Sequence, residues 1–177
     1  MTVENLTAHD RFLVVMGTAG TGKTEIGRRL AAGLQCDFVE ADELHTAESV
    51  EQMRKGIALT DAQRQPWLHA VCDRALSMPT GSAVIACSAL KRSYRDLMRV
   101  RLGAVRFFFL DGPAELIAAR LQARRGHFAS VALLESQLRT LERPGAEENA
   151  IVLDIALSPE TVTTAALEAL GVPKARC

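Results

Sequence analysis

The 177-residue sequence has no excess of charge of either sign, because its 21 acidic side chains balance its 21 basic ones. A neutral chain is poorly suited to bind a polyanion, so we expect no nucleic-acid partner and no membrane partner. Long apolar runs are also absent, and the longest, such as residues 107–110, are far too short to cross a bilayer. Neither absence excludes a small anionic ligand, because a local site needs only a few charges.

Cysteine is scarce and unpaired in the sequence. No two of the four cysteines have C-x-x-C spacing, which excludes a zinc knuckle and a dithiol motif; they are Cys36, Cys72, Cys87 and Cys177. We predict buried, apolar roles for them in a reducing compartment. The first eleven residues have neither an apolar core nor a small-residue cleavage site, so we expect no secretory signal and a cytoplasmic location.

Short apolar runs alternate with longer amphipathic stretches, without repeats or linkers. The runs are rich in Val, Ile and Phe, which is typical of strands buried on both faces; they cover residues 12–16, 38–39, 83–87, 105–110 and 151–155. Strand–helix alternation predicts an α/β fold, with a five-stranded parallel sheet between two helical layers. The length suits a single domain over residues 1–177. Residues 42–81 exceed an ordinary crossover, and we expect this insertion on the ligand side of the sheet.

Residues 17–24, GTAGTGKT, match the phosphate-binding pattern G-x-x-x-x-G-K-[ST]. They lie between an apolar strand and an amphipathic helix, a context that a chance glycine-rich turn would not need. Glycines let backbone N–H groups turn toward phosphate oxygens, and the helix N-terminus favours the same negative charge. We predict a nucleotide site formed by Gly17, Thr18, Ala19, Gly20, Thr21, Gly22, Lys23 and Thr24. Lys23 would reach the β- and γ-phosphates and Thr24 would bind Mg²⁺.

Two carboxylates, Glu40 and Asp42, close the second predicted strand. Strand alternation places both on one face, pointing toward the phosphate loop. One would deprotonate an acceptor hydroxyl, and the other would hold Mg²⁺ through water. The third strand ends in Cys87-Ser88 without an acid, so Glu40 or Asp42 is left to serve the metal. Ordinary solvated loop acids would have the same spacing, and this alternative stays open.

Arg120 and Arg124 lie four residues apart on one predicted helical face, followed closely by Gly126. A mobile arginine over the γ-phosphate would stabilise charge in the transition state, and a neighbouring glycine would permit hinge motion. A basic helix C-terminus that complements the helix dipole would contain the same residues. Position alone does not decide between the two interpretations.

The sequence resembles the small P-loop gluconokinases, which are related in fold to shikimate kinase and adenylate kinase. The resemblance covers residues 12–170. Besides the phosphate loop, its most specific segments are Asp42-Glu43-Leu44-His45, Arg64-Gln65-Pro66-Trp67-Leu68, Cys87-Ser88-Ala89-Leu90-Lys91, Tyr94-Arg95-Asp96, Gly126-His127-Phe128, and Gln137 with Leu141-Glu142 and Pro144.

The resemblance implies a kinase that uses ATP and Mg²⁺ to phosphorylate the 6-hydroxyl of D-gluconate, and it implies a homodimer. Asp42 would face the acceptor hydroxyl, which leaves Glu40 and Thr24 for the metal. The catalytic residues would be Lys23, Asp42 and Arg124, and the sugar acid would be bound by Asp42, His45, Arg64, Lys91, Arg95 and His127. Arg64 would meet the sugar carboxylate. Arg120 and Pro159 would border the adenine, and residues 124–141 would form a lid.

Five residues of the expected substrate insertion depart from the family pattern: Ala41, Thr46, Ser49, Gln52 and Ala58. A methyl group at Ala41 would crowd the backbone where the family has glycine. These departures keep open a kinase of the same fold for another sugar acid or polyol. A nucleotide-binding regulator without catalysis is a third alternative, against which the intact Lys23, Asp42 and Arg124 argue. Trp67 is predicted to be a core residue because of its helical apolar spacing.

Overall fold

A single parallel sheet organises the chain. The computed structural model describes residues 11–123 and 131–172. The strand order is β2-β3-β1-β4-β5, and every neighbouring pair is parallel. The strands are β1 (Phe12–Met16), β2 (Asp37–Glu40), β3 (Ala83–Ala86), β4 (Val105–Asp111) and β5 (Ile151–Asp154). The predicted five-stranded α/β fold is therefore confirmed.

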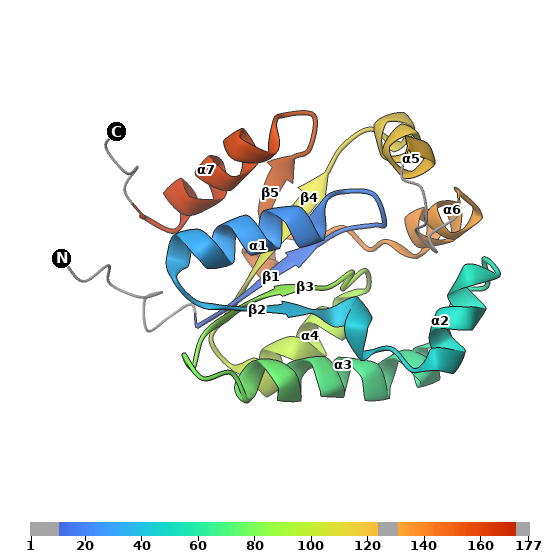
Figure 1. The fold of residues 1–177 in the computed structure, drawn as a ribbon, viewed down its shortest axis with the longest axis horizontal. Helices are drawn as coiled ribbons and strands as arrows, with labels where there is room; N and C mark the ends of the chain where they lie inside the picture. Colours follow the sequence, from blue (N-terminus) through green and yellow to red (C-terminus); the bar gives the residue numbers. More distant parts are fainter. Residues whose placement is uncertain (1–10, 124–130, 173–177) are drawn as a thin grey trace.

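Helices cover both faces of the sheet (Figure 1). On one face lie α1 (Lys23–Leu34) and α7 (Pro159–Ala169), and on the other lie α3 (Asp61–Leu76) and α4 (Arg92–Leu102). Alternation along β1 explains how one strand serves both layers. Val14 faces the core formed with α3 and α4, whereas Leu13 and Val15 face the core formed with α1 and α7. All three are completely buried, as expected for a central parallel strand.

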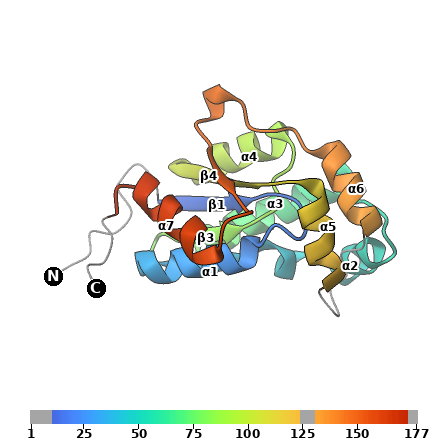
Figure 2. The same ribbon diagram turned by 90° about the horizontal axis from the view of Figure 1, so that it is seen from above.

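Three helices gather beyond the carboxyl ends of the strands, the edge where α/β sheets place their ligands (Figures 1 and 2). They are α2 (Ala47–Arg54), α5 (Ala114–Ala123) and α6 (Val131–Thr140). The predicted insertion between β2 and β3 contains a 3₁₀ turn, η1 (Ala41–Leu44), followed by α2 and α3. The described part of the predicted lid contains α6.

The helices of the insertion begin where the sequence provides capping side chains. The hydroxyl of Thr46 accepts a hydrogen bond from the amide of Ser49 at the start of α2. At the start of α3, Thr60 and Gln63 form a reciprocal capping box. Such caps satisfy amides that have no partner within the helix, so these four residues fix where the two helices start.

The described cysteines are free thiols in apolar surroundings. Cys72 and Cys87 are completely buried and Cys36 is partly buried, as predicted, whereas Cys177 lies outside the described residues. Burial raises the pKa of Cys87 to about 12, so this thiol next to the site is not a nucleophile at neutral pH. Within residues 11–123 and 131–172, no helix combines the length and apolarity needed to span a membrane.

Candidate active site

The phosphate loop connects β1 to α1 in a conformation that depends on glycine. Gly20 has φ 86° and Gly22 has φ 94°, both in the left-handed region. A Cβ atom on Gly20 would lie 2.8 Å from Cγ of Leu121, so a side chain would collide with α5. The amide of Gly17 donates to the carbonyl of Ser88, 3.3 Å away, which anchors the loop to the end of β3.

Lys23 is the first residue of α1, and its side chain folds back over the loop. Its Nζ donates to the carbonyl oxygen of Thr18 at 3.0 Å, and Oγ1 of Thr21 donates to the same oxygen at 2.9 Å. The ammonium group therefore lies beside the loop amides, where a nucleotide phosphate would bind.

The two residues predicted to bind the metal, Thr24 and Glu40, are hydrogen-bonded to each other. Oγ1 of Thr24 donates to Oε2 of Glu40 at 2.6 Å, which joins the first turn of α1 to the end of β2. Burial raises the pKa of Glu40, an effect that the hydrogen bond from Thr24 opposes. Oxygen donors of this kind fit Mg²⁺. No cluster of three His, Cys, Asp or Glu side chains suited to a metal occurs in the described parts of the chain.

The acceptor pocket, as we call it, is a cavity of about 60 Å³ beside the phosphate loop. It brings together groups from segments that are far apart in the sequence. The loop and α1 supply Lys23 and Thr24, η1 and its C-cap supply Asp42 and His45, and α3 supplies Arg64. The remaining lining residues are Ala19, Gly20, Gly22, Met53, Ser88, Leu121, Leu133 and Gln137. A carboxylate, an imidazole and a guanidinium therefore lie around one cavity together with the lysine of the phosphate loop motif.

Asp42 reaches this pocket by a different route from the predicted one. The strand β2 ends at Glu40, and Asp42 lies in the 3₁₀ turn η1. The expectation that strand alternation aligns both carboxylates was therefore wrong, since alternation stops where the strand stops. The tight turn nevertheless brings Asp42 to the cavity that Lys23 lines.

His45 and Arg64 lie together at the acceptor pocket, and Arg64 supplies the positive charge on this side. The ring of His45 stacks on the indole of Trp67, with 4.2 Å between ring centroids and 12° between planes. Burial lowers the pKa of His45 and Arg64 lowers it further, while Asp42 opposes both, so the imidazole is neutral at physiological pH. Arg64 is also buried, and its Nε donates to the carbonyl of Leu59 at 3.2 Å.

The structure places Lys91 and Arg95 outside the lining of the acceptor pocket. Lys91 forms an ion pair with Asp61, with 2.8 Å between Nζ and Oδ2. Arg95 has an exposed fraction of 0% and binds both carboxylate oxygens of Glu148, at 2.6 and 2.7 Å. It also donates to the carbonyls of Ala89 and Leu90. Arg124 and His127 lie outside the described residues.

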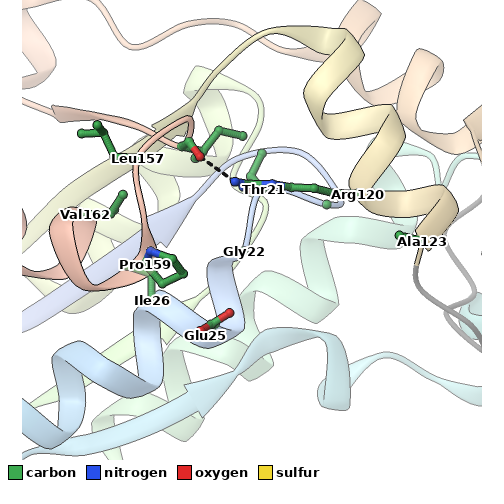
Figure 3. Close-up of a pocket in the computed structure, with 11 residues that line it drawn as sticks. Thr21, Gly22, Glu25, Ile26, Arg120, Ala123, Leu157, Pro159 and Val162 are labelled. Carbon is green, nitrogen blue, oxygen red and sulfur yellow. Dashed lines mark hydrogen bonds between the residues drawn. The ribbon is translucent and has the colours of Figure 1, made fainter.

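The nucleotide pocket is a second cavity, of about 300 Å³, on the α7 side of the phosphate loop (Figure 3). Arg120 lies at its edge, where Nη2 donates to the carbonyl of Ile155 at 2.7 Å, and Pro159 and Val162 add an apolar wall. Gly20 and Gly22 line both cavities. The two pockets therefore meet at the phosphate loop, as transfer between two bound molecules requires.

A contact between α6 and the phosphate loop has no local sequence signal. Gln137 on α6 accepts a hydrogen bond from the phosphate-loop amide of Ala19, with 2.6 Å between Oε1 and the nitrogen. On the same helix, Leu133 forms a small apolar cluster with Met53 and Leu59 of the insertion. The only sequence signal for Gln137 was its place in the family motif, because no local pattern predicts a contact across 118 residues.

These features define a small P-loop kinase with a nucleotide pocket and an acceptor pocket on either side of its phosphate loop. The family model described as shikimate kinase matches residues 19–170. The chain is 46% identical to a gluconokinase of Gluconobacter oxydans, over 86% of each chain. It is 45% identical to the thermosensitive gluconokinase of Escherichia coli, over 78% of this chain and 75% of that one. The chain belongs to the gluconokinase family.

A solved structure supports the same assignment. The crystal structure of a gluconokinase from Sinorhizobium meliloti has a TM-score of 0.83 and 40% identity to this chain, covering 92% of this chain and 93% of that one. A sugar kinase from Janibacter, solved without ligands, has a TM-score of 0.86 and 43% identity over 92% of this chain and 95% of that one. The predicted family and fold are confirmed.

Proposed function

We propose that the protein transfers the γ-phosphate of ATP to the 6-hydroxyl of D-gluconate, giving 6-phosphogluconate and ADP. The observation that carries the proposal is the composition of the acceptor pocket, where Asp42, His45 and Arg64 line one cavity with Lys23. A sugar acid needs a cation for its carboxylate and hydrogen-bonding groups for its hydroxyls. Arg64 supplies the first and His45 contributes to the second.

The chemistry follows from the placement of these groups. Asp42 accepts the proton of the 6-hydroxyl. As it does so, the oxygen of that hydroxyl bonds to the γ-phosphorus, and the bond between the γ-phosphorus and the bridging oxygen of ADP breaks. Lys23 and the loop amides hold the phosphates in line. Thr24 and Glu40 would hold Mg²⁺, which neutralises phosphate charge when it is bound. We assign Arg124 to the charge of the transition state from the sequence and the resemblance alone.

The family departures do not argue against gluconate, because none of the five residues lines the acceptor pocket. Thr46 and Ser49 are engaged in capping α2, and Gln52 donates to the carbonyl of Ala58. The methyl of Ala41 is buried in the core, and Ala41 lies in a 3₁₀ turn with a backbone conformation that does not require glycine. The departures therefore build the insertion and leave the groups facing the acceptor unchanged.

An acceptor screen tests the proposed function. ADP release from ATP and Mg²⁺ is measured with D-gluconate, other sugar acids, shikimate, nucleoside monophosphates and the polyol sorbitol, which lacks a carboxylate. We expect the highest kcat/KM with D-gluconate and a much lower value with sorbitol. A higher kcat/KM with another acceptor would overturn the assignment of gluconate, and ATP binding without turnover on any acceptor would favour the regulator.

Replacing Glu40 with Gln is expected to weaken the use of Mg²⁺. The amide oxygen of Gln still accepts the hydrogen bond from Thr24, so the fold is kept, but the negative charge that attracts the cation is lost. We expect roughly a tenfold rise in the Mg²⁺ concentration that gives half-maximal turnover. Titrating turnover with Mg²⁺ measures this, and Glu43→Gln, which removes an exposed carboxylate that lines neither pocket, is the control. Identical titrations would exclude Glu40 from the metal site.

We infer a homodimer from the family resemblance alone. The proposed cytoplasmic location rests on the scattered cysteines, a pattern typical of a reducing compartment. No nucleic-acid partner is included, because the net charge of the chain is zero.

A further inference from the structure

The indole of Trp67 contacts the turn that contains Asp42. Its Nε1 donates to the carbonyl oxygen of Ala41 at 2.7 Å. Its ring face stacks on His45, with 4.2 Å between the centroids. Ala41 is the first residue of the turn η1, and His45 is its C-cap. The side chain of Trp67 therefore contacts both ends of the turn that contains Asp42.

Trp67 is itself packed in the core by the helix that carries it. Trp67 has an exposed fraction of 5%, and it packs in the core with Val71 and Cys72 of the same helix. Arg64 lies three residues before Trp67, which places both side chains on one face of α3. The helix therefore presents Arg64 to the acceptor pocket and Trp67 to the turn that faces it.

We propose that Trp67 is a positioning residue for phosphoryl transfer, because its N–H and its ring face together hold the turn that aims Asp42 into the acceptor pocket. The inference rests on the proposed function, in which Asp42 accepts the proton. Trp67 itself does not line the acceptor pocket. It acts through the backbone of Ala41 and the ring of His45.

A purely apolar core role would require burial and contact, without a direction for the N–H. The hydrogen bond to Ala41 provides that direction. The indole has a single N–H donor, and the carbonyl oxygen of Ala41 accepts its hydrogen bond. Loss of the bond would let the turn shift by a fraction of an ångström. Misplacement on this scale slows turnover because the reacting atoms must be close and aligned.

The first test compares three variants by steady-state kinetics. Trp67→Phe keeps an apolar ring but loses the N–H, and replacing the indole with a benzothiophene ring removes the N–H at nearly constant shape. We expect kcat to fall roughly 10- to 100-fold in both, with KM for ATP changed less than about twofold. The control is Val71→Ala, which removes apolar volume from the same core but leaves the contacts of Trp67 with Ala41 and His45 in place. An unchanged kcat in the benzothiophene protein, or an equal loss in Val71→Ala, would overturn the proposal.

A double-mutant cycle asks whether Trp67 acts through Asp42. If it does, Trp67→Phe causes little further loss of turnover in the Asp42→Asn background, because the group being positioned is already absent. Full additivity of the two losses would indicate that Trp67 affects turnover by another route and would contradict the proposal.

Hydrogen exchange gives a readout that is independent of the acceptor. We expect amide exchange in residues 41–45 to accelerate at least about tenfold in Trp67→Phe but not in Val71→Ala, when both are measured under native conditions. Unchanged exchange in residues 41–45 would overturn the positioning role whatever the acceptor is. Accelerated exchange in a protein that does not phosphorylate D-gluconate would keep the positioning role and reject the proposed acceptor.

Discussion

Replacing Asp42 with Asn is expected to remove nearly all turnover, by roughly 10²- to 10⁴-fold in kcat, the range typical of a lost general base. Asn has almost the same shape, so the turn η1 and the acceptor pocket should be retained. The acceptor hydroxyl would lose the carboxylate that takes its proton as the bond to phosphorus forms. ADP release at saturating ATP and D-gluconate measures the effect, and ATP affinity measured by calorimetry should be unchanged, because Asp42 does not line the nucleotide pocket.

The neighbouring acid provides a matched control for this experiment. Glu43 belongs to the same 3₁₀ turn, but it is exposed and does not line the acceptor pocket. Glu43→Gln removes one negative charge from the same turn, as Asp42→Asn does. It leaves in place the carboxylate that lines the acceptor pocket. We expect it to keep wild-type turnover. Comparable losses in the two variants, or more than a tenth of wild-type activity in Asp42→Asn, would contradict the role of Asp42.

The sheet could be predicted from the sequence because its signals are local. Buried parallel strands are continuous apolar runs, and β1 was predicted with its observed bounds, Phe12–Met16. The strand β2 has only four residues and one buried side chain, Val39, so its apolar run was short. The C-terminal end of β2 decides where Asp42 lies. Hydrophobic periodicity does not indicate the residue at which a strand ends and a 3₁₀ turn begins. Asp42 does lie at the cavity lined by Lys23, as predicted. The prediction assumed strand alternation, however, whereas Asp42 reaches the cavity from the turn η1.

The candidate site could be predicted from the sequence only where a local motif determines the local backbone structure. The phosphate loop requires glycines and a lysine in a fixed order, and the motif therefore indicates its structure. Arg95, Trp67 and Gln137 act through contacts with residues far away in the sequence, namely Glu148, Ala41 and Ala19. Such contacts depend on the packed fold, so no local pattern reveals them. The motif containing Arg95 was visible, but its partner Glu148 was not.

Replacing Arg95 with Met is expected to give the largest loss of stability. Arg95 is completely buried, and the side chain of Glu148 has an exposed fraction of 3%. Removing the guanidinium would leave a buried carboxylate without its main partner and would release the carbonyls of Ala89 and Leu90. We expect the free energy of unfolding to fall by about 3–5 kcal/mol, as is typical when one member of a buried ion pair is lost.

Urea unfolding at pH 7 measures this change, with Arg29→Met as the matched control. Arg29 forms ion pairs with Glu25 and Glu160, all with side chains more than a third exposed, so its loss should cost about 1 kcal/mol or less. In a second variant, Met replaces both Arg95 and Glu148, and we expect it to recover part of the lost stability because no charge remains buried. Equal losses in Arg95→Met and Arg29→Met would contradict the structural role of the buried pair.

The dependence of stability on pH provides an independent check of the same pair. Hydrogen bonds from Arg95 hold the pKa of Glu148 at about 2, below the ordinary value of 4.5. A depressed folded-state pKa means that the pair stabilises the protein fully above about pH 4.5 and that this contribution disappears as the pH falls toward 2. In Arg95→Met the carboxylate has lost its main cation, so lowering the pH through this window should reduce stability less than in the wild type. Parallel pH profiles would show that Arg95 does not set the ionisation of Glu148.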